Sequence, residues 1–444
     1  MLRVLADRTY RHLFLAQVVS LVGTGLATVA LGLLAYELAG ANAGAVLGTA
    51  LAIKMIAYVG VAPVAAAFAE RAPRRALLVG LDLARAAVAL CLPFVTEVWQ
   101  VYLLIFVLQS ASAGFTPTFQ ATIPDVLPDE RDYTNALSLS RLAYDLESLL
   151  SPMLAAALLT LISFHALFAG TSVGFLLSAA FVVSVALPNP KLAAPRGIWT
   201  ATIRGIRLYL ATPRLRGLLA LTLAAAAASA MVIVNTVVLV QAEFGLNPSQ
   251  VALALAAYGG GSMAAALALP RVLERVGDRP VMLGGAVLLV SGMLLGPLAT
   301  GLPSLLPLWF LLGVGYASTL TPSGRLLRRS AHPEDRPALF AAQFALSHVC
   351  WLFTYPLAGR FGAAAGLAPT FLVMAGVAIA GILATVRLWP GDQSDAPEHQ
   401  HAMLRPSHAH LADYPVDAAG RHAHPFVIDD LHPAWHRGAA WRGV

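Results

Sequence analysis

Charged residues are scarce in this chain of 444 residues. Asp, Glu, Lys and Arg together make up 12% of it, whereas hydrophobic residues make up 58%. Soluble domains carry about 25% charged residues, so this composition excludes an ordinary soluble protein. Cysteine is rarer still: Cys91 and Cys350 both lie in apolar stretches and do not indicate a disulfide framework.

Common catalytic motifs are also missing from the sequence. It contains no glycine-rich loop with a Walker lysine, no zinc-protease H-E-x-x-H and no nucleophile elbow. ATP hydrolysis and membrane proteolysis are therefore not indicated, and we expect neither an enzyme nor a cofactor. The net charge of +6 is dispersed over short loops, which does not indicate a nucleic-acid partner.

Long hydrophobic stretches are what the chain does have. A helix of roughly 20 apolar residues crosses the hydrocarbon of a bilayer. The sequence predicts an all-α integral membrane protein with twelve transmembrane helices, near residues 13–37, 43–69, 76–96, 98–120, 134–160, 164–187, 217–241, 250–272, 280–300, 303–323, 337–359 and 366–389.

The positions of Lys and Arg predict the orientation of these helices. Basic residues gather before residue 13 and in the segments 71–75, 191–216, 271–279 and 325–336, whereas the alternate loops carry only Arg360. Loops rich in Lys and Arg stay in the cytoplasm. We therefore expect both termini to be cytoplasmic.

The chain repeats itself at a separation of 204 or 205 residues. The matching segments are Glu70-Arg71 with Glu274-Arg275, Thr116-Pro117 with Thr321-Pro322, Pro128–Arg131 with Pro333–Arg336, and Pro152 with Pro356. The two members of each match occupy equivalent positions, one among the first six predicted helices and the other among the last six. The sequence therefore predicts two six-helix repeats with the same orientation.

This parallel repeat resembles the major facilitator superfamily of transporters. The loop Ala69–Arg75 is similar to the family's signature between helices 2 and 3, although it lacks the glycine, which the second copy keeps at Gly277. The resemblance implies an N-terminal bundle (1–187), a basic cytoplasmic linker with an amphipathic helix on the inner leaflet (188–216), a C-terminal bundle (217–389) and a tail (390–444). It also implies gating by charged residues, for which Glu70, Arg71, Asp82, Arg85, Glu274 and Arg275 are the candidates. We expect Asp82 and Arg85 to pair near the cytoplasmic end of their helix, or to clamp the adjacent basic loop.

Ionisable side chains inside the predicted helices are candidates for transport, since each costs about 2.5 kcal/mol or more to insert. On the fifth helix, Arg141 and Asp145 are four residues apart and can pair, which leaves Glu147 without a cation on its own helix. We therefore expect Glu147 or Asp145 to bind substrate or protons. The alternative is an interhelical salt bridge, with Lys54 as partner.

The eleventh helix is the mate of the fifth and carries His348 where the fifth carries Tyr144. In the family, helices 2 and 11 pack together, and so do helices 5 and 8. By that analogy we expect one line of contact between helices 2 and 11, which we call the seam. It would contain Lys54, Met55, His348 and Cys350. The alternative for His348 is a hydrogen bond between helices.

Eight of the twelve histidines lie within residues 399–444, in three His-x-His motifs and two single positions. They are His399, His401, His408, His410, His422, His424, His432 and His436. Imidazole suits divalent nickel, cobalt and zinc, and the tail has no cysteine that would favour Cu(I). The composition predicts metal binding, and the segment 426–435 is apolar enough to dock on the bundle.

A histidine-rich cytoplasmic tail resembles that of bacterial nickel-resistance exporters of the same superfamily. The resemblance implies a monomer in the bacterial inner membrane that exports nickel, or cobalt, iron or zinc, in exchange for protons. One alternative is an exporter of an organic compound, such as a drug, siderophore or metal chelate, whose tail only senses metal. Another is a membrane receptor that binds metal without transporting it.

Overall fold

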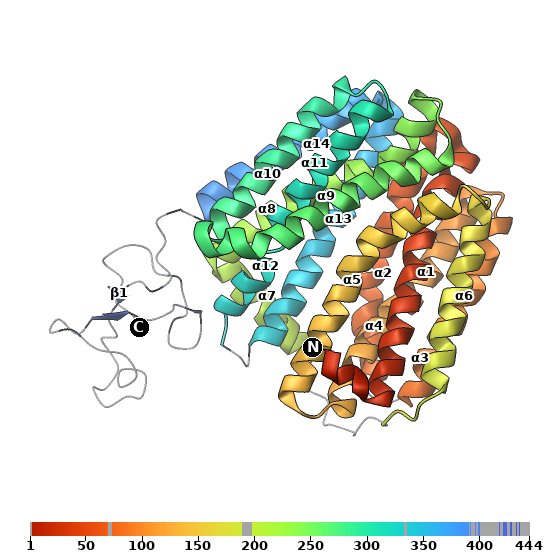
Figure 1. The fold of residues 1–444 in the computed structure, drawn as a ribbon. Coiled ribbons are helices and arrows are strands. Elements are labelled where there is room, and N and C mark those ends of the chain that lie inside the picture. Colours follow the sequence, from red (N-terminus) through yellow and green to blue (C-terminus); the bar gives the residue numbers. More distant parts are fainter. Residues whose placement is uncertain are drawn as a thin grey trace.

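A computed structural model shows an almost entirely helical protein. It describes residues 2–69, 73–188, 198–332 and 335–389, and the tail positions 391, 396, 398, 399, 417, 421–423, 427, 428, 432 and 435. Figure 1 shows two groups of long helices, one for each half of the chain.

The first half forms six long helices, each covering one predicted span. They are α1 (Arg8–Ala39), α2 (Ala43–Ala69), α3 (Arg74–Cys91), α4 (Val98–Val126), α5 (Glu130–Leu158) and α6 (Phe164–Val183). Short 3-10 turns are η1 (Leu2–Ala6), η2 (Gly40–Asn42) and η3 (Leu92–Phe94). The carboxylates of Asp7 and Asp129 start α1 and α5, because each accepts a backbone N–H of the first turn.

The second half repeats this arrangement. Its long helices are α8 (Pro213–Val237), α9 (Pro248–Val276), α10 (Asp278–Leu295), α11 (Leu302–Leu320), α13 (Arg336–Ala365) and α14 (Leu367–Leu388). The shorter elements are α7 (Ile198–Ala211), the π-helical turn η4 (Val238–Glu243), η5 (Gly296–Leu298) and α12 (Ser323–Arg329). In the tail, β1 (Glu398–His399) pairs antiparallel with β2 (His422–Ala423). The predicted fold of two six-helix repeats is confirmed.

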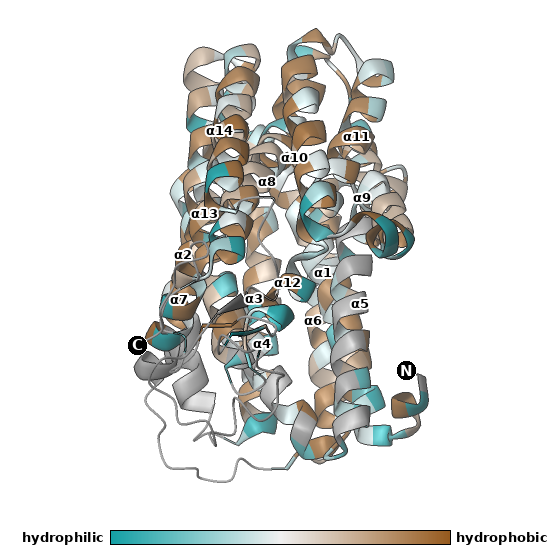
Figure 2. Cartoon of the chain, turned by 90° about the vertical axis from the view of Figure 1, so that its left-hand side faces the viewer, coloured by the Kyte–Doolittle hydropathy of each residue, from teal (hydrophilic) through white to brown (hydrophobic). Residues whose placement is uncertain are grey.

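The helices are apolar enough to span a membrane. Within the described residues, ten segments meet this condition by length and composition, and the first, Arg8–Val61, contains both α1 and most of α2. Part of α5 lies outside the described residues, and α5 is not among these ten. Figure 2 shows hydrophobic residues along much of α10, α11 and α14.

Among the described side chains, the core that the two halves share lies at one end of the bundle. We name the end at which α3 and α10 begin the basic end, because Arg74 and Arg279 lie there, and the opposite end the distal end. The largest buried cluster joins distal residues of both halves, such as Leu34 and Leu47 with Val237 and Phe371. Toward the basic end, the described part of each half has a separate cluster. The halves are therefore packed most tightly at the distal end.

The predicted amphipathic helix of the linker exists as α7, but protein covers part of its apolar face. Tyr209 is buried, and its hydroxyl donates to the Gln343 side chain of α13. The Arg204 guanidinium holds the carboxylate of Asp335 through two hydrogen bonds of 2.8 and 2.9 Å. Ile203 is 62% exposed and remains available to lipid. α7 is fastened to the start of α13, and its predicted position on the inner leaflet stays a prediction.

Candidate functional site

The helices that the sequence predicts to meet across the two halves do so. α2 packs against α13, and α5 packs against α9. These four helices line the interface between the halves, and they carry Lys54, Glu147, Tyr258 and His348. The interface is the candidate site.

Lys54 and Glu147 are the charged members of the site whose side chains the structure describes. The ammonium group of Lys54 in α2 and the carboxylate of Glu147 in α5 interact electrostatically. Glu147 lies against Gly25 of α1, where an added Cβ would come within 2.8 Å of its Oε1 and would overlap Ser151. Gly25 therefore makes the room in which Glu147 is held. The side chains of Arg141 and Asp145 lie outside the described residues, so their predicted pairing stays a prediction.

Tyr58 joins Lys54 to His348 and was missed by the sequence analysis. The Nζ atom of Lys54 lies 5.9 Å from the centroid of the Tyr58 ring. That ring stacks on His348 at 5.5 Å between centroids. The Nδ1 atom of His348 is 2.6 Å from the carbonyl oxygen of Phe344. The seam of Lys54 with His348 is thus present, and the position of Tyr58, one helical turn after Lys54, was the signal that could have located it.

Cys350 does not belong to this seam. It is buried and lies two turns after Gln343 on the same face of α13, the face whose Gln343 accepts the hydrogen bond of Tyr209. The prediction that Cys350 lines the seam is wrong, because two residues of helix turn the side chain by about 200° from His348. Met55 is buried in the shared hydrophobic core.

The second half presents aromatic residues at positions equivalent to the charged pair. Adding the repeat length of 204 to Lys54 gives Tyr258, and adding it to Glu147 gives Trp351. Ring centroids lie 5.8 Å apart between Tyr258 and Tyr316, 6.4 Å between Tyr316 and Trp351, and 5.2 Å between Trp351 and Tyr355. The site therefore has a charged side and an aromatic side. The repeat offset was the sequence signal for the aromatic one.

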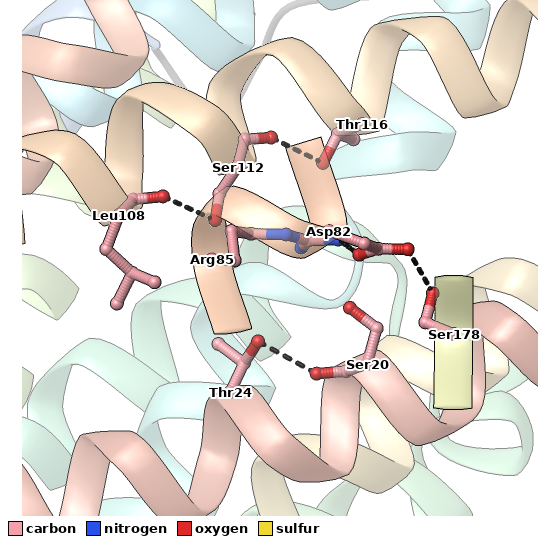
Figure 3. A network of polar contacts seen from close by, with 8 residues as sticks. All are labelled: Ser20, Thr24, Asp82, Arg85, Leu108, Ser112, Thr116 and Ser178. Carbon is pink, nitrogen blue, oxygen red and sulfur yellow. Dashed lines mark hydrogen bonds and ion pairs between the residues drawn. The ribbon is translucent and has the colours of Figure 1, made fainter. Parts of the chain in front are cut away.

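Asp82 and Arg85 form an ion pair within the first half (Figure 3). The Asp82 carboxylate also accepts a hydrogen bond of 2.7 Å from Ser178. The Arg85 guanidinium lies 4.1 Å from the ring centroid of Phe115 and 4.4 Å from that of Phe175. The predicted pairing is confirmed. Its predicted position near the end of the helix is wrong, since the two residues lie in the middle of α3 and contact α4 and α6.

The ion pairs at the basic end differ from those predicted. Arg74 of α3 pairs with Asp125 of α4, and Asp278 of α10 pairs with Arg329 of α12 at 3.1 Å. Adding 204 to Arg74 and Asp125 gives Asp278 and Arg329, so the second half repeats the pair with reversed charges.

The residues of the second half that were predicted to gate lie apart from these ion pairs. Glu274 and Arg275 are exposed at the end of α9 and belong to none of the described ion pairs. Asp278, which the sequence analysis did not select, begins α10 and forms the ion pairs here, with Arg325 and Arg329. Glu70 and Arg71 lie outside the described residues.

The structure describes only part of the histidine tail. The strand register places His399 opposite His422. His422 and His432 are buried, with exposed fractions of 3% and 0%. The other tail histidines (His401, His408, His410, His424 and His436) lie outside the described residues. Among the described residues, no group of three His, Cys, Asp or Glu side chains is arranged to hold a metal ion.

The predicted docking of the segment 426–435 is seen in its described residues. Ile428 and Trp435 pack against Leu208 and Ala211 of α7, and the Arg214 guanidinium lies 5.2 Å from the centroid of the Trp435 ring. The segment therefore contacts the linker helix and the start of α8.

Sequence comparison covers both halves. Residues 13–235 and 218–427 each match the Major Facilitator Superfamily. The chain belongs to the Major Facilitator Superfamily. This family consists of transporters, which agrees with the expectation that the chain is not an enzyme. A related sequence is an uncharacterized MFS-type transporter, YfiS, of Bacillus subtilis (strain 168), which is 27% identical over 141 residues; the match spans 30% of this chain and 34% of YfiS.

Solved structures of the superfamily share the fold. The nucleoside transporter NupG, as a point mutant, matches with a TM-score of 0.66 at 15% identity, over 86% of this chain and 100% of that structure. A POT family transporter in complex with 5-aminolevulinic acid matches with a TM-score of 0.68 at 11% identity, over 86% and 96% of the two chains. A bacterial homologue of the human lysosomal transporter Spinster matches with a TM-score of 0.65 at 13% identity, over 86% and 97%. At such identities these likenesses show the fold alone.

Proposed function

We propose that this protein exports a divalent transition metal from the bacterial cytoplasm in exchange for protons, by alternating access. Nickel is the foremost candidate, with cobalt, iron and zinc behind it. Membership of a transporter family supports the transport, and the histidine-rich tail supports the metal. The protein works as a monomer in the inner membrane.

The observation that carries the proposal is the register of the tail strands. β1 and β2 belong to different His-x-His motifs, and their pairing places His399 opposite His422. Residues directly opposite each other in an antiparallel pair have Cβ atoms about 4.5–5.5 Å apart. Two histidines at that spacing can share one ion, and imidazole suits nickel, cobalt and zinc.

The charge distribution supports the direction of transport. Lys and Arg concentrate at the basic end, and loops with this composition stay in the cytoplasm. The tail follows α14 at that end, so it meets cytosolic metal. Among the described residues the core shared by the halves is largest at the distal end, and the basic end is proposed to open and load metal from the cytoplasm.

Glu147 supports the coupling to protons. Burial in the bundle disfavours a charged carboxylate, whereas a bound metal ion requires the charged form. Metal and proton therefore compete for Glu147, assisted by Asp145, and a proton from the distal side displaces the metal. Lys54 neutralises Glu147 in the absence of metal.

Carboxylate variants in vesicles test this coupling. We expect Glu147→Gln and Asp145→Asn each to lower metal-for-proton exchange by about tenfold or more, since an amide neither binds the metal as an anion nor carries the proton. Glu37→Gln is the control, because Glu37 is exposed near the distal end of α1. If both site variants keep full exchange, the proposed coupling is wrong.

The aromatic side of the site favours a second candidate, the export of an organic compound. The rings of Tyr258, Tyr316, Trp351 and Tyr355 form a continuous series that can stack on a flat or cationic organic group. Cells that express Trp351→Ala separate the two candidates. A metal exporter keeps most of its nickel resistance in this variant, whereas an organic-cation exporter loses resistance to aromatic cations and confers none to nickel.

A further inference from the structure

A small cavity lies within the first half of the protein. It is lined by residues of α1, α2, α4 and α6 and by Leu92 of η3, and Lys54 of the candidate site is one of them. Its volume is about 30 Å³, whereas the site of one water molecule needs about 10–15 Å³. A group of the size of water or an ammonium therefore fits, and a hydrated metal ion does not.

The hydroxyl groups of the lining residues are available as acceptors. Thr24, Thr28 and Ser112 each donate to the carbonyl oxygen four residues earlier in their own helix, at 2.9, 3.0 and 3.0 Å. Figure 3 shows two of these bonds, from Thr24 to Ser20 and from Ser112 to Leu108. A hydroxyl has one proton to donate and two lone pairs. Each of the three oxygens can therefore accept a further hydrogen bond, which suits a cation with N–H groups better than an anion.

The ammonium group of Lys54 is such a cation, and it belongs to a residue that lines the cavity. It carries three N–H donors on a flexible four-carbon stem, which matches the three hydroxyl acceptors. In the conformation seen, it interacts electrostatically with Glu147, and its Nζ lies 5.9 Å from the centroid of the Tyr58 ring. Lys54 thus adjoins two regions that attract a cation, the carboxylate at the interface and the cavity in the first half.

The nearby cation Arg85 does not cancel this attraction. Phe175 lines the cavity, and the Arg85 guanidinium lies 4.4 Å from the centroid of its ring. Asp82 pairs with Arg85, so the two side chains together carry no net charge. The cavity therefore keeps its preference for a cation.

We propose that this cavity is a second binding site for the Lys54 ammonium, the ammonium site, which Lys54 enters when Glu147 binds metal or a proton. A carboxylate occupied by either cation no longer compensates Lys54, and an uncompensated buried charge is costly. Thr24, Thr28 and Ser112 lower that cost, so they are positioning residues for Lys54. Neutral hydroxyls compensate the charge only in part, so Lys54 returns to Glu147 when the metal leaves. This inference rests on the proposed function, in that Glu147 must bind the exported metal.

NMR of the lysine side chain tests the movement. Lys54 and Lys191 are the only lysines of the chain, so the full-length Lys191→Arg protein with isotope-labelled lysine reports on Lys54 alone. We expect its Nζ signal to shift when Glu147→Gln removes the carboxylate, and also when zinc, which is diamagnetic, is added to the protein that keeps Glu147. In both states Thr24→Val with Ser112→Ala should shift the signal again, and by far less in the metal-free protein with Glu147.

Thr122→Val is the matched control for these substitutions. The Thr122 hydroxyl makes the same kind of bond on α4, to the Thr118 carbonyl at 2.8 Å, and it does not line the cavity. This variant should leave the Lys54 signal unchanged in every state. A signal that ignores the cavity substitutions both in Glu147→Gln and with zinc would overturn the ammonium site.

Transport provides the second test. In inverted vesicles, Thr24→Val with Ser112→Ala should raise the nickel concentration that half-saturates exchange by about tenfold, because hydrogen bonds to a charged group are lost in the metal-bound state. In the Lys54→Met protein, which has no ammonium to receive, the same substitutions should change it little. An equal increase in both proteins would show that the hydroxyls act on the metal or on packing, which contradicts the ammonium site.

The ammonium site and the proposed function can fail separately. If Lys54 enters the cavity in Glu147→Gln while no metal displaces it or is transported, the ammonium site stands and metal export is wrong. If nickel is exported while the Lys54 signal ignores the cavity substitutions, only the ammonium site is wrong.

Discussion

Gly48 of α2 and Tyr355 of α13 touch backbone to backbone across the two halves: a Cβ added at Gly48 would lie 2.5 Å from the Tyr355 carbonyl oxygen. One turn nearer the distal end, Gly359 is packed in the same way against the carbonyl of Gly44. Such small residues let membrane helices approach closely. The two contacts join the halves at the distal end, and the proposed alternating access requires them to separate.

A larger residue at this crossing should open the distal end. We expect Gly48→Val to shift the protein toward a state with separated distal ends, because the added side chain cannot fit against the Tyr355 backbone. Spin labels at the exposed positions Ala41 and Thr300 report the distance between the halves at that end. Gly60→Val, in open space on the same helix, is the control. Identical distance distributions for Gly48→Val and the control would count against this gate.

Gly25 should be required for the position of Glu147. The Cβ of Gly25→Ala would overlap Ser151 and crowd the Glu147 carboxylate. Overpacking of this kind costs about 1–3 kcal/mol of stability, and the displaced carboxylate should lower metal-for-proton exchange. Gly32→Ala is the control, because its nearest neighbour would be a Leu47 methyl at 3.6 Å. Thermal unfolding in detergent and vesicle exchange provide the two measurements, and equal behaviour of both variants would refute the packing argument.

Lys54 and Glu147 should be energetically coupled. Removing either charge leaves the other buried without compensation. The double variant, Lys54→Met with Glu147→Gln, should therefore lose less stability than the sum of the losses in the two single variants. Neighbouring residues of this kind show coupling free energies of about 0.5–3 kcal/mol. Thermal unfolding of the wild type, the two single variants and the double variant measures this coupling free energy. A coupling of zero would mean that the two side chains act independently.

The Asp82 pair with Arg85 should matter more for stability than the pairs at the basic end. Asp82→Ala leaves a guanidinium buried between Phe115 and Phe175, and breaking a buried pair costs about 3–5 kcal/mol. Asp125→Ala breaks the pair with Arg74, in which the carboxylate is 43% exposed, and should cost about 1 kcal/mol or less. Similar losses in the two variants would show that Arg85 finds another partner.

The fold could be predicted because its signals are local. Hydrophobic stretches of spanning length placed every long helix, and the 204-residue repeat placed the halves. The predicted contact of Lys54 with the helix of His348 followed from that repeat and the family resemblance. The contact is present, with Tyr58 between the two side chains.

The side-chain positions that could not be predicted depend on how each helix is rotated about its own axis and on how strands pair. Cys350 is two residues from His348 and lies on the face of α13 that carries Gln343, and which face meets α2 depends on packing between helices. Asp278 was overlooked because the more conspicuous Glu274-Arg275 repeat matched Glu70-Arg71. The opposition of His399 and His422 depends on a strand register between residues 23 apart in the sequence, which composition does not predict.

Uptake of radioactive nickel into inverted membrane vesicles tests the central claim most directly. Inverted vesicles expose the cytoplasmic face, and an acidic lumen supplies the proton gradient. The account predicts that nickel accumulates when the lumen is acidic, that an uncoupler abolishes the accumulation, and that Glu147→Gln vesicles do not accumulate it. Cobalt and zinc measured in parallel rank the substrates. If none of the three metals accumulates under an acid-inside gradient while the protein is folded in the membrane, metal export by proton exchange is wrong.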